Sequence, residues 1–189
     1  MASNSAQTLH IKNMVCQRCV RVVREELERL GYTVHDVELG KAEVSGNINS
    51  EDTQKALQQA GFELLTDQKV QLIEQLKTLI IELVHYSDEP LRVNYSDYLS
   101  QKTNREYGYL SQLFSSHEGT TLERYIILQK IEKVKELLVY GQLTLSEIAH
   151  LQHYSSVAHL SSQFKQVTGL TPTQFKQLQQ KNRKPLDQV

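Results

Sequence analysis

The stretch that decides the fold is TLSEIAHLQHYSSVAHLSSQFKQVTGLTPTQFK, residues 144–176. It opens with Thr144 and Glu147, the spacing of a capping box, in which each side chain accepts a hydrogen bond from the other residue's backbone N–H. Apolar residues at helical spacing follow, so a short helix is predicted from this point. The pair His153 and Tyr154 then interrupts the apolar pattern and predicts the end of that helix.

Two further helices are predicted in the same stretch. One starts at Ser155 and Ser156, carries apolar residues at helical spacing and ends at Gly169. The other starts at Thr171 as its N-cap, with a proline in its first position. A helix, a tight turn and a second helix form the pattern of a helix-turn-helix, whose second helix enters the major groove of DNA. An ordinary helical hairpin would show the same local pattern.

The stretch occurs twice, because a shift of 50 residues aligns an earlier segment with it without a gap. Repetition of capping, core and helix-ending residues at one fixed spacing indicates two copies of one supersecondary unit. The conservative pairs are Asp97/Glu147 and Tyr125/Phe175, and the identical pairs are Ser96/Ser146, Leu110/Leu160, Ser111/Ser161, Phe114/Phe164, Gly119/Gly169 and Thr121/Thr171.

The segment SEIA…YSSVAHLSSQFKQVTGLTPTQF resembles the signature of the AraC/XylS family of bacterial transcription regulators. The resemblance covers residues 70–180 and implies two helix-turn-helix units joined by a long helix, here residues 122–140. The chain departs from the family at Lys130 and Val134, where Arg and Ala are usual, and at His153, where a turn glycine is usual. A residue other than glycine with positive φ is strained but tolerable, so we expect the fold to be kept.

The same resemblance implies the DNA contacts. Serine, glutamine and histidine can hydrogen-bond base edges, and small apolar side chains can contact thymine methyl groups. Double-stranded DNA and RNA polymerase are the implied partners, and a homodimer is allowed. The implied base-edge residues are Gly108, Ser111 and Gln112 in the first unit and Val157, Ala158, His159 and Ser162 in the second, with Gln163 and Lys165 facing phosphate.

Residues 9–65 show strand and helix patterns in alternation. Strand patterns cover residues 9–13, 32–39, 42–44 and 62–65, and helix patterns cover residues 20–30 and 50–60. The order βαββαβ predicts a ferredoxin-like α/β sandwich. The first eight residues are polar and are expected to form a loose leader.

The two cysteines of the chain, Cys16 and Cys19, lie where a strand pattern meets a helix pattern. Backbone amides and the dipole of a helix N-terminus favour thiolates, and Arg18 and Arg21 add positive charge. Two thiolates without another soft ligand suit a low-coordinate soft cation, above all Cu(I), whereas Zn(II) usually takes four ligands. Two structural cysteines without a ligand and a dithiol redox switch are the alternatives.

Residues 9–65 also resemble the heavy-metal-associated domain of copper chaperones and copper pumps. The matching residues are Met14, Cys16, Cys19, Gly61 and Phe62. The resemblance implies Cys16 and Cys19 as metal ligands, Met14 as a buried support, and a copper chaperone or another metal donor as partner. Asn13 stands where the family usually has glycine. Val15 places no carboxylate beside the first cysteine, which favours Cu(I) over Zn(II).

Residues 66–69 are predicted to join the two halves, followed by a helix over residues 70–86 that is apolar on more than one face. One face is expected to pack in the first helix-turn-helix, residues 91–125. The excess apolar residues Leu72 and Ile81 are expected to be buried within one subunit, with the N-terminal domain or a second subunit as alternatives. The basic tail is expected near phosphate, at Lys181, Arg183 and Lys184.

Composition limits the classes of function. The chain has 21 Lys+Arg and 22 Asp+Glu, a net charge of −1. Residues 1–68 hold 7 basic and 10 acidic residues (−3), and residues 69–189 hold 14 and 12 (+2), which predicts modest non-specific DNA affinity. No run of 18 apolar residues and no signal-peptide pattern is present, so we predict a cytoplasmic protein without membrane association. No Ser/His/Asp, paired-carboxylate or phosphate-loop pattern is present, so an enzyme is not expected.

Together these patterns predict an α+β protein with a ferredoxin-like βαββαβ sandwich in residues 1–68. An all-α DNA-binding domain of two helix-turn-helix units joined by a long helix is predicted in residues 69–189. The predicted function is a sequence-specific transcription regulator that responds to a soft metal ion, Cu(I) before Zn(II), through Cys16 and Cys19. Two competing functions are a metal-trafficking or buffering protein whose helical half docks partners, and a thiol oxidoreductase.

Overall fold

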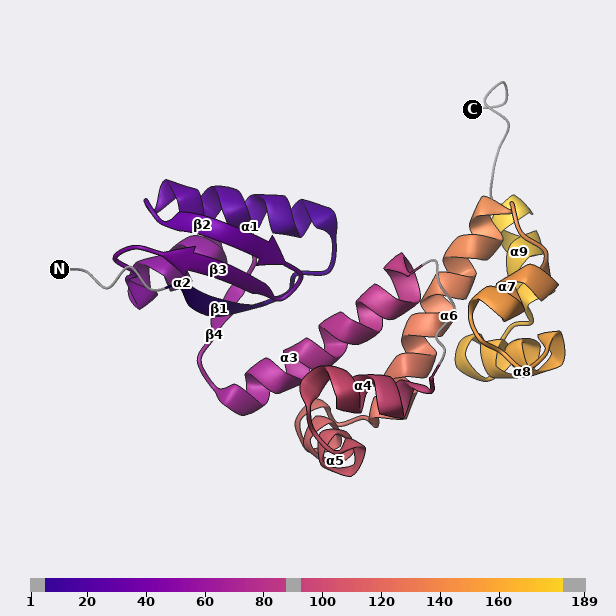
Figure 1. Ribbon diagram of the computed structural model, residues 1–189. Coiled ribbons are helices and arrows are strands. Elements are labelled where there is room, and N and C mark those ends of the chain that lie inside the picture. The colour runs from indigo at the N-terminus through magenta and orange to yellow at the C-terminus, as the bar shows by residue number, and fades with distance from the viewer. Residues whose placement is uncertain (1–5, 88–92, 182–189) are drawn as a thin grey trace, which may run out of the picture. The chain divides into compact units, whose positions relative to one another are not determined.

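The structure is a computed structural model that describes residues 6–87 and 93–181 of the 189-residue chain (Figure 1). Arg183 and Lys184 of the basic tail lie outside these ranges, and so do the first two residues, 91 and 92, of the predicted first helix-turn-helix. No helix in the described part is both long and apolar enough to cross a membrane. The chain packs as two compact units, Met1–Leu79 with Leu99–Leu113, and Ile80–Tyr98 with Phe114–Val189.

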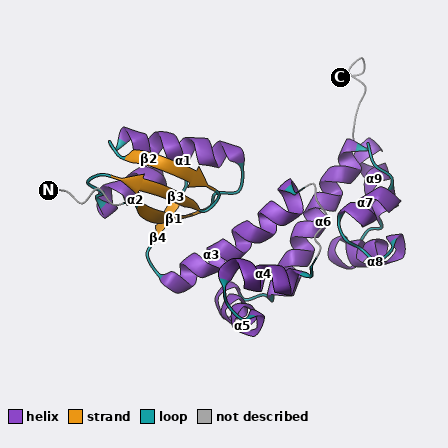
Figure 2. Ribbon diagram, viewed as in Figure 1, coloured by secondary structure: helices purple, strands orange, loops and turns teal. Residues whose placement is uncertain are grey.

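The N-terminal part is a four-stranded antiparallel sheet with two helices, so the protein is α+β (Figure 2). The strands lie in the order β2-β3-β1-β4, and each neighbouring pair is antiparallel. The predicted βαββαβ order along the chain is confirmed. The elements are β1 (Gln7–Lys12), α1 (Gln17–Arg29), β2 (Thr33–Glu38), β3 (Lys41–Ser45), α2 (Ser50–Gln59) and β4 (Glu63–Leu65).

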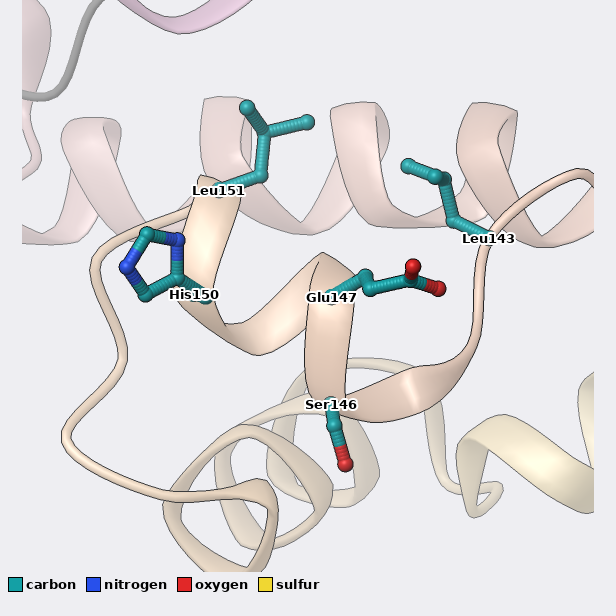
Figure 3. A pocket seen from close by; sticks show the side chains of 5 residues that line it. All are labelled: Leu143, Ser146, Glu147, His150 and Leu151. Carbon is teal, nitrogen blue, oxygen red and sulfur yellow. The ribbon is translucent and has the colours of Figure 1, made fainter.

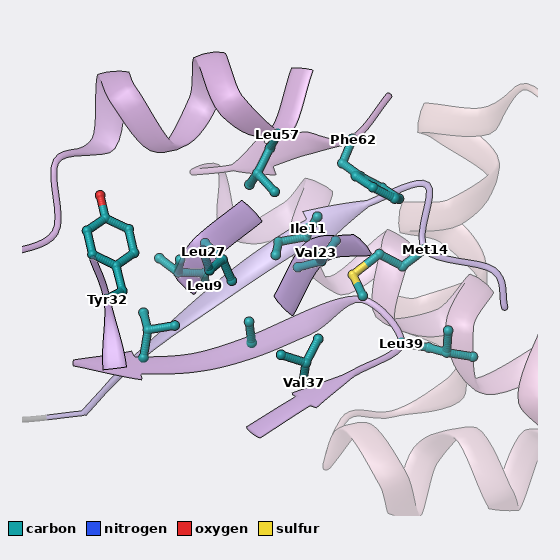
Figure 4. Close-up of a cluster of buried hydrophobic side chains, with 12 residues drawn as sticks. Leu9, Ile11, Met14, Val23, Leu27, Tyr32, Val37, Leu39, Leu57 and Phe62 are labelled. Atoms are coloured by element: carbon teal, nitrogen blue, oxygen red, sulfur yellow. The ribbon is translucent and has the colours of Figure 1, made fainter. Parts of the chain in front are cut away.

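One face of the sheet is apolar because alternate residues of a strand point to the same side. Leu9 and Ile11 of β1 are buried, and Leu9 lies opposite Ala42 of β3. Helices α1 and α2 contribute Val23 and Leu57 to the same cluster (Figure 4). The whole cluster consists of Leu9, Ile11, Met14, Val23, Leu27, Tyr32, Val37, Leu39, Ala42, Val44, Leu57 and Phe62.

Strand β1 begins at Gln7, two residues before the predicted start. Gln7 and Thr8 lie opposite Val44 and Glu43 of β3. Backbone pairing with β3 extends the strand, whereas the side chains at its start are polar. The prediction of a loose leader is therefore wrong for these two residues, and the other three strands agree with prediction within one residue at each end.

Helix α1 begins at Gln17, three residues before the predicted start at residue 20. Cys16 is its N-cap residue, and the Cys16 carbonyl accepts hydrogen bonds from the N–H groups of Cys19 at 2.9 Å and Val20 at 3.3 Å. The prediction placed the start too late because Val20 is the first apolar residue of the helix, whereas its first turn is mostly polar. Cys19 thus lies inside the first helical turn.

Helix α3 (Gln68–Ile81) follows the sheet directly. The Asp67 carboxylate accepts hydrogen bonds from the N–H groups of Lys69 at 2.7 Å and Val70 at 3.2 Å. An aspartate N-cap satisfies the free donors of a first turn, so the helix starts earlier than its apolar pattern. The connection is therefore shorter than the predicted residues 66–69.

The predicted helix over residues 70–86 ends as a π-helical turn, η1 (Glu82–Tyr86). The ring of His85 in this turn lies with Nε2 3.0 Å from Oε1 of Gln129. π-Helical turns hold one extra residue per turn, which an apolar period does not reveal. The excess apolar residues Leu72 and Ile81 are half-buried.

Six helices make up the rest of the described chain. They are α4 (Tyr95–Thr103), α5 (Tyr107–Glu118), α6 (Leu122–Tyr140), α7 (Leu145–Leu151), α8 (Val157–Thr168) and α9 (Pro172–Lys181). Helix α6 is the predicted long connecting helix, with the predicted bounds. Its buried stripe repeats at helical spacing and contains one charged residue among apolar ones: Leu122, Ile126, Lys130, Ile131, Val134 and Leu138.

A second hydrophobic core is built from α6, α7 and α8. Its centre contains Phe164, which has no exposed surface, and the half-buried ring of Phe175 from α9 packs against it. The buried members are Ile131, Val134, Leu138, Ile148, Ala149, Tyr154, Leu160 and Phe164.

Candidate nucleic-acid interface and thiol pair

The two helix-turn-helix units repeat the same buried side chains. In the first, the ring centroids of Phe114 and Tyr125 are 5.4 Å apart, and in the second those of Phe164 and Phe175 are 5.5 Å apart. Matched burial and matched ring pairs confirm the repeat predicted from the 50-residue shift. The shared residues without exposed surface are Leu110, Phe114, Leu160 and Phe164.

The ends of the second helices repeat as well. Gly119 and Gly169 follow α5 and α8 with φ of +67° and +79°, a left-handed conformation that glycine adopts at little cost. Thr121 and Thr171 then cap α6 and α9. Each threonine hydroxyl accepts a hydrogen bond from the N–H three residues later, at 3.1 Å and 3.2 Å.

The first helices, α4 and α7, each begin with a side-chain cap. The Asn94 side-chain oxygen accepts from the N–H of Asp97 at 2.8 Å. The Thr144 hydroxyl accepts from the N–H of Glu147 at 3.3 Å, and the Glu147 carboxylate accepts from the N–H of Thr144 at 2.7 Å. The capping box predicted at Thr144 is therefore confirmed.

The turn between the two helices spans residues 104–106 in the first unit and residues 152–156 in the second. The left-handed residue is Asn104 in the first, with φ +52°, and His153 in the second, with φ +53°. In both, the next residue donates its N–H to a carbonyl five residues back, at 3.3 Å and 2.8 Å. A shift of 50 places Asn104 on Tyr154, so the left-handed residue comes one position earlier in the second unit. The strained residue expected at His153 is present.

Helix α8 presents a polar stripe opposite its buried residues. Val157 and Gln163, at the margin of the stripe, are half-buried. The structure thus gathers most residues predicted for the second unit on one helix face. The exposed members are Ala158, His159, Ser162 and Lys165.

The His159 ring is held by residues of the turn before α8. Its Nδ1 lies 3.0 Å from the Ser155 hydroxyl. The ring is nearly perpendicular to that of Tyr154, at 87° with centroids 5.2 Å apart. Nε2 is the other ring nitrogen and can serve as donor or acceptor at a base edge. A side chain already ordered in this way loses less conformational freedom on binding.

Tyr154 also contacts Gln163, one of the two residues predicted to face DNA phosphate. The Tyr154 hydroxyl donates to Oε1 of Gln163 at 2.7 Å. This leaves the amide NH₂ of Gln163 as its group for an outside partner. From the sequence, Tyr154 was expected only to mark the end of a helix; an aromatic residue inside a polar turn is the signal that could have indicated a further role.

Lys130 is a buried charge of α6 with 9% of its surface exposed. Its Nζ lies 4.0 Å from the ring centroid of Tyr154 and 6.0 Å from that of Tyr95. Burial lowers the pKa of Lys130 to about 8. A lysine within an apolar helical pattern is a sequence signal that could have indicated a buried charge, whereas Lys130 was predicted only as a departure from the family pattern.

In the first unit, helix α5 exposes Gly108 and Gln112, and Ser111 is half-buried. Tyr109 has 45% of its surface exposed, although large aromatic residues are usually buried. Tyr109 and Gln112 share a helix face because they lie three residues apart. Tyr109 therefore joins the candidate surface of α5, and sequence reasoning missed it.

Cys16 and Cys19 carry the second candidate site. Their sulfur atoms lie 3.4 Å apart, both residues are half-buried, and neither forms a disulfide. The backbone N–H and then the thiol of Cys19 lower the pKa of the Cys16 thiol. This supports the predicted thiolate character of Cys16.

The loop before the cysteines is anchored to the sheet domain. Asn13 has φ +72°, and its side-chain amide donates to the carbonyl of Gly61 at 3.3 Å. Met14 is 3% exposed, which confirms that it is buried, and it lies at the same end of the core as Phe62 (Figure 4). The loop that precedes the thiol pair is therefore held to the domain by the Asn13 hydrogen bond and by the buried Met14 side chain.

The thiol pair can supply two sulfur ligands to one ion, because the two sulfur atoms lie 3.4 Å apart. Within residues 6–87 and 93–181, no group of three or more His, Cys, Asp or Glu is placed to hold a metal ion.

An open apolar pocket lies on α7 (Figure 3). Its lining residues are Leu143, Ser146, Glu147, His150 and Leu151. The Glu147 carboxylate accepts hydrogen bonds from the N–H and hydroxyl of Thr144, both at 2.7 Å, and these bonds lower its pKa. This carboxylate therefore stabilises the start of α7.

Comparison with known proteins identifies the helical part. Residues 99–178 match a family model described as "Helix-turn-helix domain". A segment of 63 residues is 32% identical to "Probable transcriptional regulator LumQ" from Photobacterium leiognathi. That alignment covers 33% of this chain and 25% of the LumQ protein, so the chain spans a quarter of the length of this relative.

Solved structures share the fold. One is a transcriptional regulator from Chromobacterium violaceum, described among AraC-type DNA-binding domain-containing proteins, with a TM-score of 0.51 and 19% identity over 59% of this chain and 95% of that one. Another is the DNA-binding domain of AdpA in complex with a target DNA, with a TM-score of 0.50 and 18% identity over 59% and 95%. The helical part of this chain therefore contains a helix-turn-helix domain and shares its fold with these two structures, and the proteins it matches are described as transcriptional regulators or factors.

Proposed function

We propose that this chain is a cytoplasmic, sequence-specific transcription regulator that binds double-stranded DNA through both helix-turn-helix units. The observation that carries the proposal is the duplicated framework, in which each second helix is buried on its Leu/Phe side and polar on its exposed side. Two such helices suit two successive major-groove segments about 34 Å apart. RNA polymerase and a homodimeric state are further expectations that follow from the AraC/XylS resemblance.

In the second unit, His159 and Ser162 are the proposed hydrogen-bonding readers of base edges. Ala158 and Val157 suit thymine methyl groups, because small apolar side chains contact them without a polar cost. Lys165 is exposed on the same helix and suits phosphate, with the amide of Gln163 beside it. Exposure and chemistry thus support base reading by His159, Ser162 and the two small apolar residues, and phosphate binding by Lys165 and Gln163.

In the first unit, Gln112 and Tyr109 are the proposed base readers, with Ser111 at the margin. Glutamine can form two hydrogen bonds to an adenine edge, because its carbonyl oxygen accepts and its NH₂ group donates. Gly108 lacks a side chain, and it allows close approach of the α5 backbone to DNA.

The proposal is tested with duplexes that the full-length chain selects from a random-sequence pool. Nuclease footprinting should show protection over two neighbouring major-groove segments. His159→Ala or Ser162→Ala should relax the base preference in one segment by about 1–3 kcal/mol. Lys165→Ala should weaken binding to all sequences and reduce the salt slope by about one. Gln177→Ala in α9 is the matched control, and protection of a single segment would contradict the two-unit reading.

We further propose that the N-terminal part is a ferredoxin-like, heavy-metal-associated domain that holds a soft metal ion between Cys16 and Cys19. The strand order, the anchored loop and the adjacent thiols support it. Cu(I) fits two soft sulfur ligands better than Zn(II), which usually takes four. A bound Cu(I) would neutralise thiolate charge at the start of α1, and a copper chaperone or another donor would deliver it.

The metal proposal is tested on the reduced full-length chain by competition with a chromogenic Cu(I) chelator. DNA affinity is then compared with and without one equivalent of Cu(I), for the wild type and for Cys16→Ser with Cys19→Ser. Coupling between two sites is typically about 1–3 kcal/mol, or about 5–150-fold in affinity. A metal-dependent change that the double variant loses supports a sensor. Equal affinities in all four samples would remove the sensing role.

A dithiol switch is the second candidate, because the sulfurs are 3.4 Å apart and the pKa of Cys16 is lowered. Two thiols would lose two protons and two electrons to form one S–S bond of about 2.05 Å, with oxidised glutathione as the electron acceptor. Glutathione-dependent and metal-independent changes in DNA affinity would favour this candidate over the metal site.

A further inference from the structure

We infer that Lys130 is a positioning residue for DNA reading, which acts through Tyr154 on the Gln163 and His159 side chains of α8. The consequence for DNA rests on the proposed function, whereas the positioning itself is a property of the free protein.

The first step is the contact between Lys130 and Tyr154. Nζ of Lys130 lies over the Tyr154 ring, 4.0 Å from its centroid, within the range of a cation–π interaction. The ring centroid of Tyr95 lies farther from Nζ of Lys130, at 6.0 Å. Burial is the cause of the lowered Lys130 pKa, and the described ion pairs include none to this lysine. Its charge is therefore met by aromatic rings.

The second step runs from Tyr154 into α8. Tyr154 is 7% exposed, so its ring has little freedom. Its hydroxyl donates to Gln163 at 2.7 Å, and its ring meets that of His159 at 87°. One aromatic side chain thus contacts Lys130 through its face and two residues of the candidate DNA surface through its hydroxyl and ring.

Burying the Lys130 ammonium group costs folding free energy, so we expect its charge to have a function. An ammonium group taken out of water loses solvation, and an apolar side chain would fill the same place in the α6 stripe without that cost. Burial lowers the pKa of His153 most, and the positive charge of Lys130 lowers it further. The charge of Lys130 therefore acts on a residue of the turn. The charged or titratable groups around Tyr154 and the turn are Lys130, Tyr95, His150, His153 and His159.

The test begins with the free protein and the variants Lys130→Met and Lys130→Arg. A guanidinium stacks on aromatic faces, so arginine should keep the contact and methionine should lose it. NMR signals of the His159 ring and the Gln163 side-chain amide should move in Lys130→Met and stay near wild type in Lys130→Arg. Lys135→Met is the matched control, because Lys135 pairs with Glu132 at 2.6 Å on the same helix.

The second measurement uses a duplex that the wild-type full-length chain has selected from a random-sequence pool. Lys130→Met should lower base discrimination about tenfold in the segment read by α8 and leave the segment read by α5 unchanged. Lys130→Arg should restore it. Tyr154→Phe keeps the ring but removes the donor to Gln163, so it should move the Gln163 amide signal while the protein remains folded.

Unmoved His159 and Gln163 signals in Lys130→Met would overturn the inference, as would an equal loss of discrimination in both DNA segments or a failure of arginine to restore it. If Lys130→Met does not fold, an unmoved Gln163 signal in Tyr154→Phe overturns it. A third outcome separates the two proposals. If the NMR signals move as expected but the wild-type protein selects no DNA sequence, the positioning role of Lys130 is supported and the proposed function is contradicted.

Discussion

The first helix-turn-helix unit, α4–α5, and the second, α7–α8, have the same framework but different turns. Leu110 and Phe114 are matched by Leu160 and Phe164 in burial. The residue after the left-handed turn position is the exposed Arg105 in the first unit and the buried Tyr154 in the second. The core and caps that hold the second helix are thus shared, whereas the side chain that braces its exposed face belongs to one unit only.

The largest expected effect comes from truncating the buried phenylalanine that each unit contains. Phe114→Ala and Phe164→Ala should each lower the free energy of unfolding by about 3–5 kcal/mol, because each removes a fully buried ring and its contact with a second aromatic ring. Urea unfolding of the full-length chain measures both. A large loss at one position with a small loss at the other would mean that the two units are not equivalent in packing.

A smaller, matched effect is expected at the second caps. Thr121→Ala and Thr171→Ala should each cost about 1 kcal/mol, since each removes the acceptor of a first-turn N–H. Serine at either position should recover most of the loss, because it keeps the hydroxyl. If serine is no better than alanine in thermal unfolding, the hydroxyl bonds do not stabilise these helices.

The turns should respond differently to glycine. His153→Gly should raise the free energy of unfolding by up to about 1 kcal/mol, because it relieves a left-handed conformation that histidine tolerates poorly. Asn104→Gly should change it little, since asparagine adopts positive φ more readily. Equal effects at the two positions would remove this difference between the turns.

The smallest effect is a pH dependence at the capping box of α7. Thr144 lowers the pKa of Glu147, so the ionised carboxylate stabilises the folded state above the unfolded pKa of about 4.3, and this is lost as the pH falls through the lower folded value. Wild type should therefore melt slightly above Glu147→Gln at about pH 7, with the gap closing towards about pH 3. Asp97→Asn is the matched control in the first unit. A gap that widens on acidification would contradict the assigned direction.

Prediction from sequence succeeded where neighbouring residues set the structure. The cap at Thr144, the left-handed Gly169 and the cap at Thr171 were all predictable, since each motif depends on residues within one or two turns. The start of α1 was placed three residues late, because its first turn is mostly polar and carries no apolar period. For the thiol pair, spacing placed Cys16 and Cys19 together at a helix start, as observed.

Tyr109 of the candidate DNA surface was missed because its exposure depends on which face of α5 the rest of the chain leaves open. The hydrogen bond between Gln163 and Tyr154 was missed, because the sequence does not show that a residue nine positions earlier binds the Gln163 carbonyl oxygen. A single aromatic residue in a turn has many possible neighbours, and only the packed chain selects among them.

By itself, the sequence determined the repeat, its caps, its buried Leu and Phe positions and the βαββαβ order, because these are carried by short-range periodicity and hydrogen bonding. Tertiary structure decided the strand pairing that begins at Gln7, the π-helical turn at η1 and the contact of Lys130 with Tyr154. These depend on groups brought together from distant parts of the chain. Their free energy comes from backbone pairing and burial, which no local pattern records.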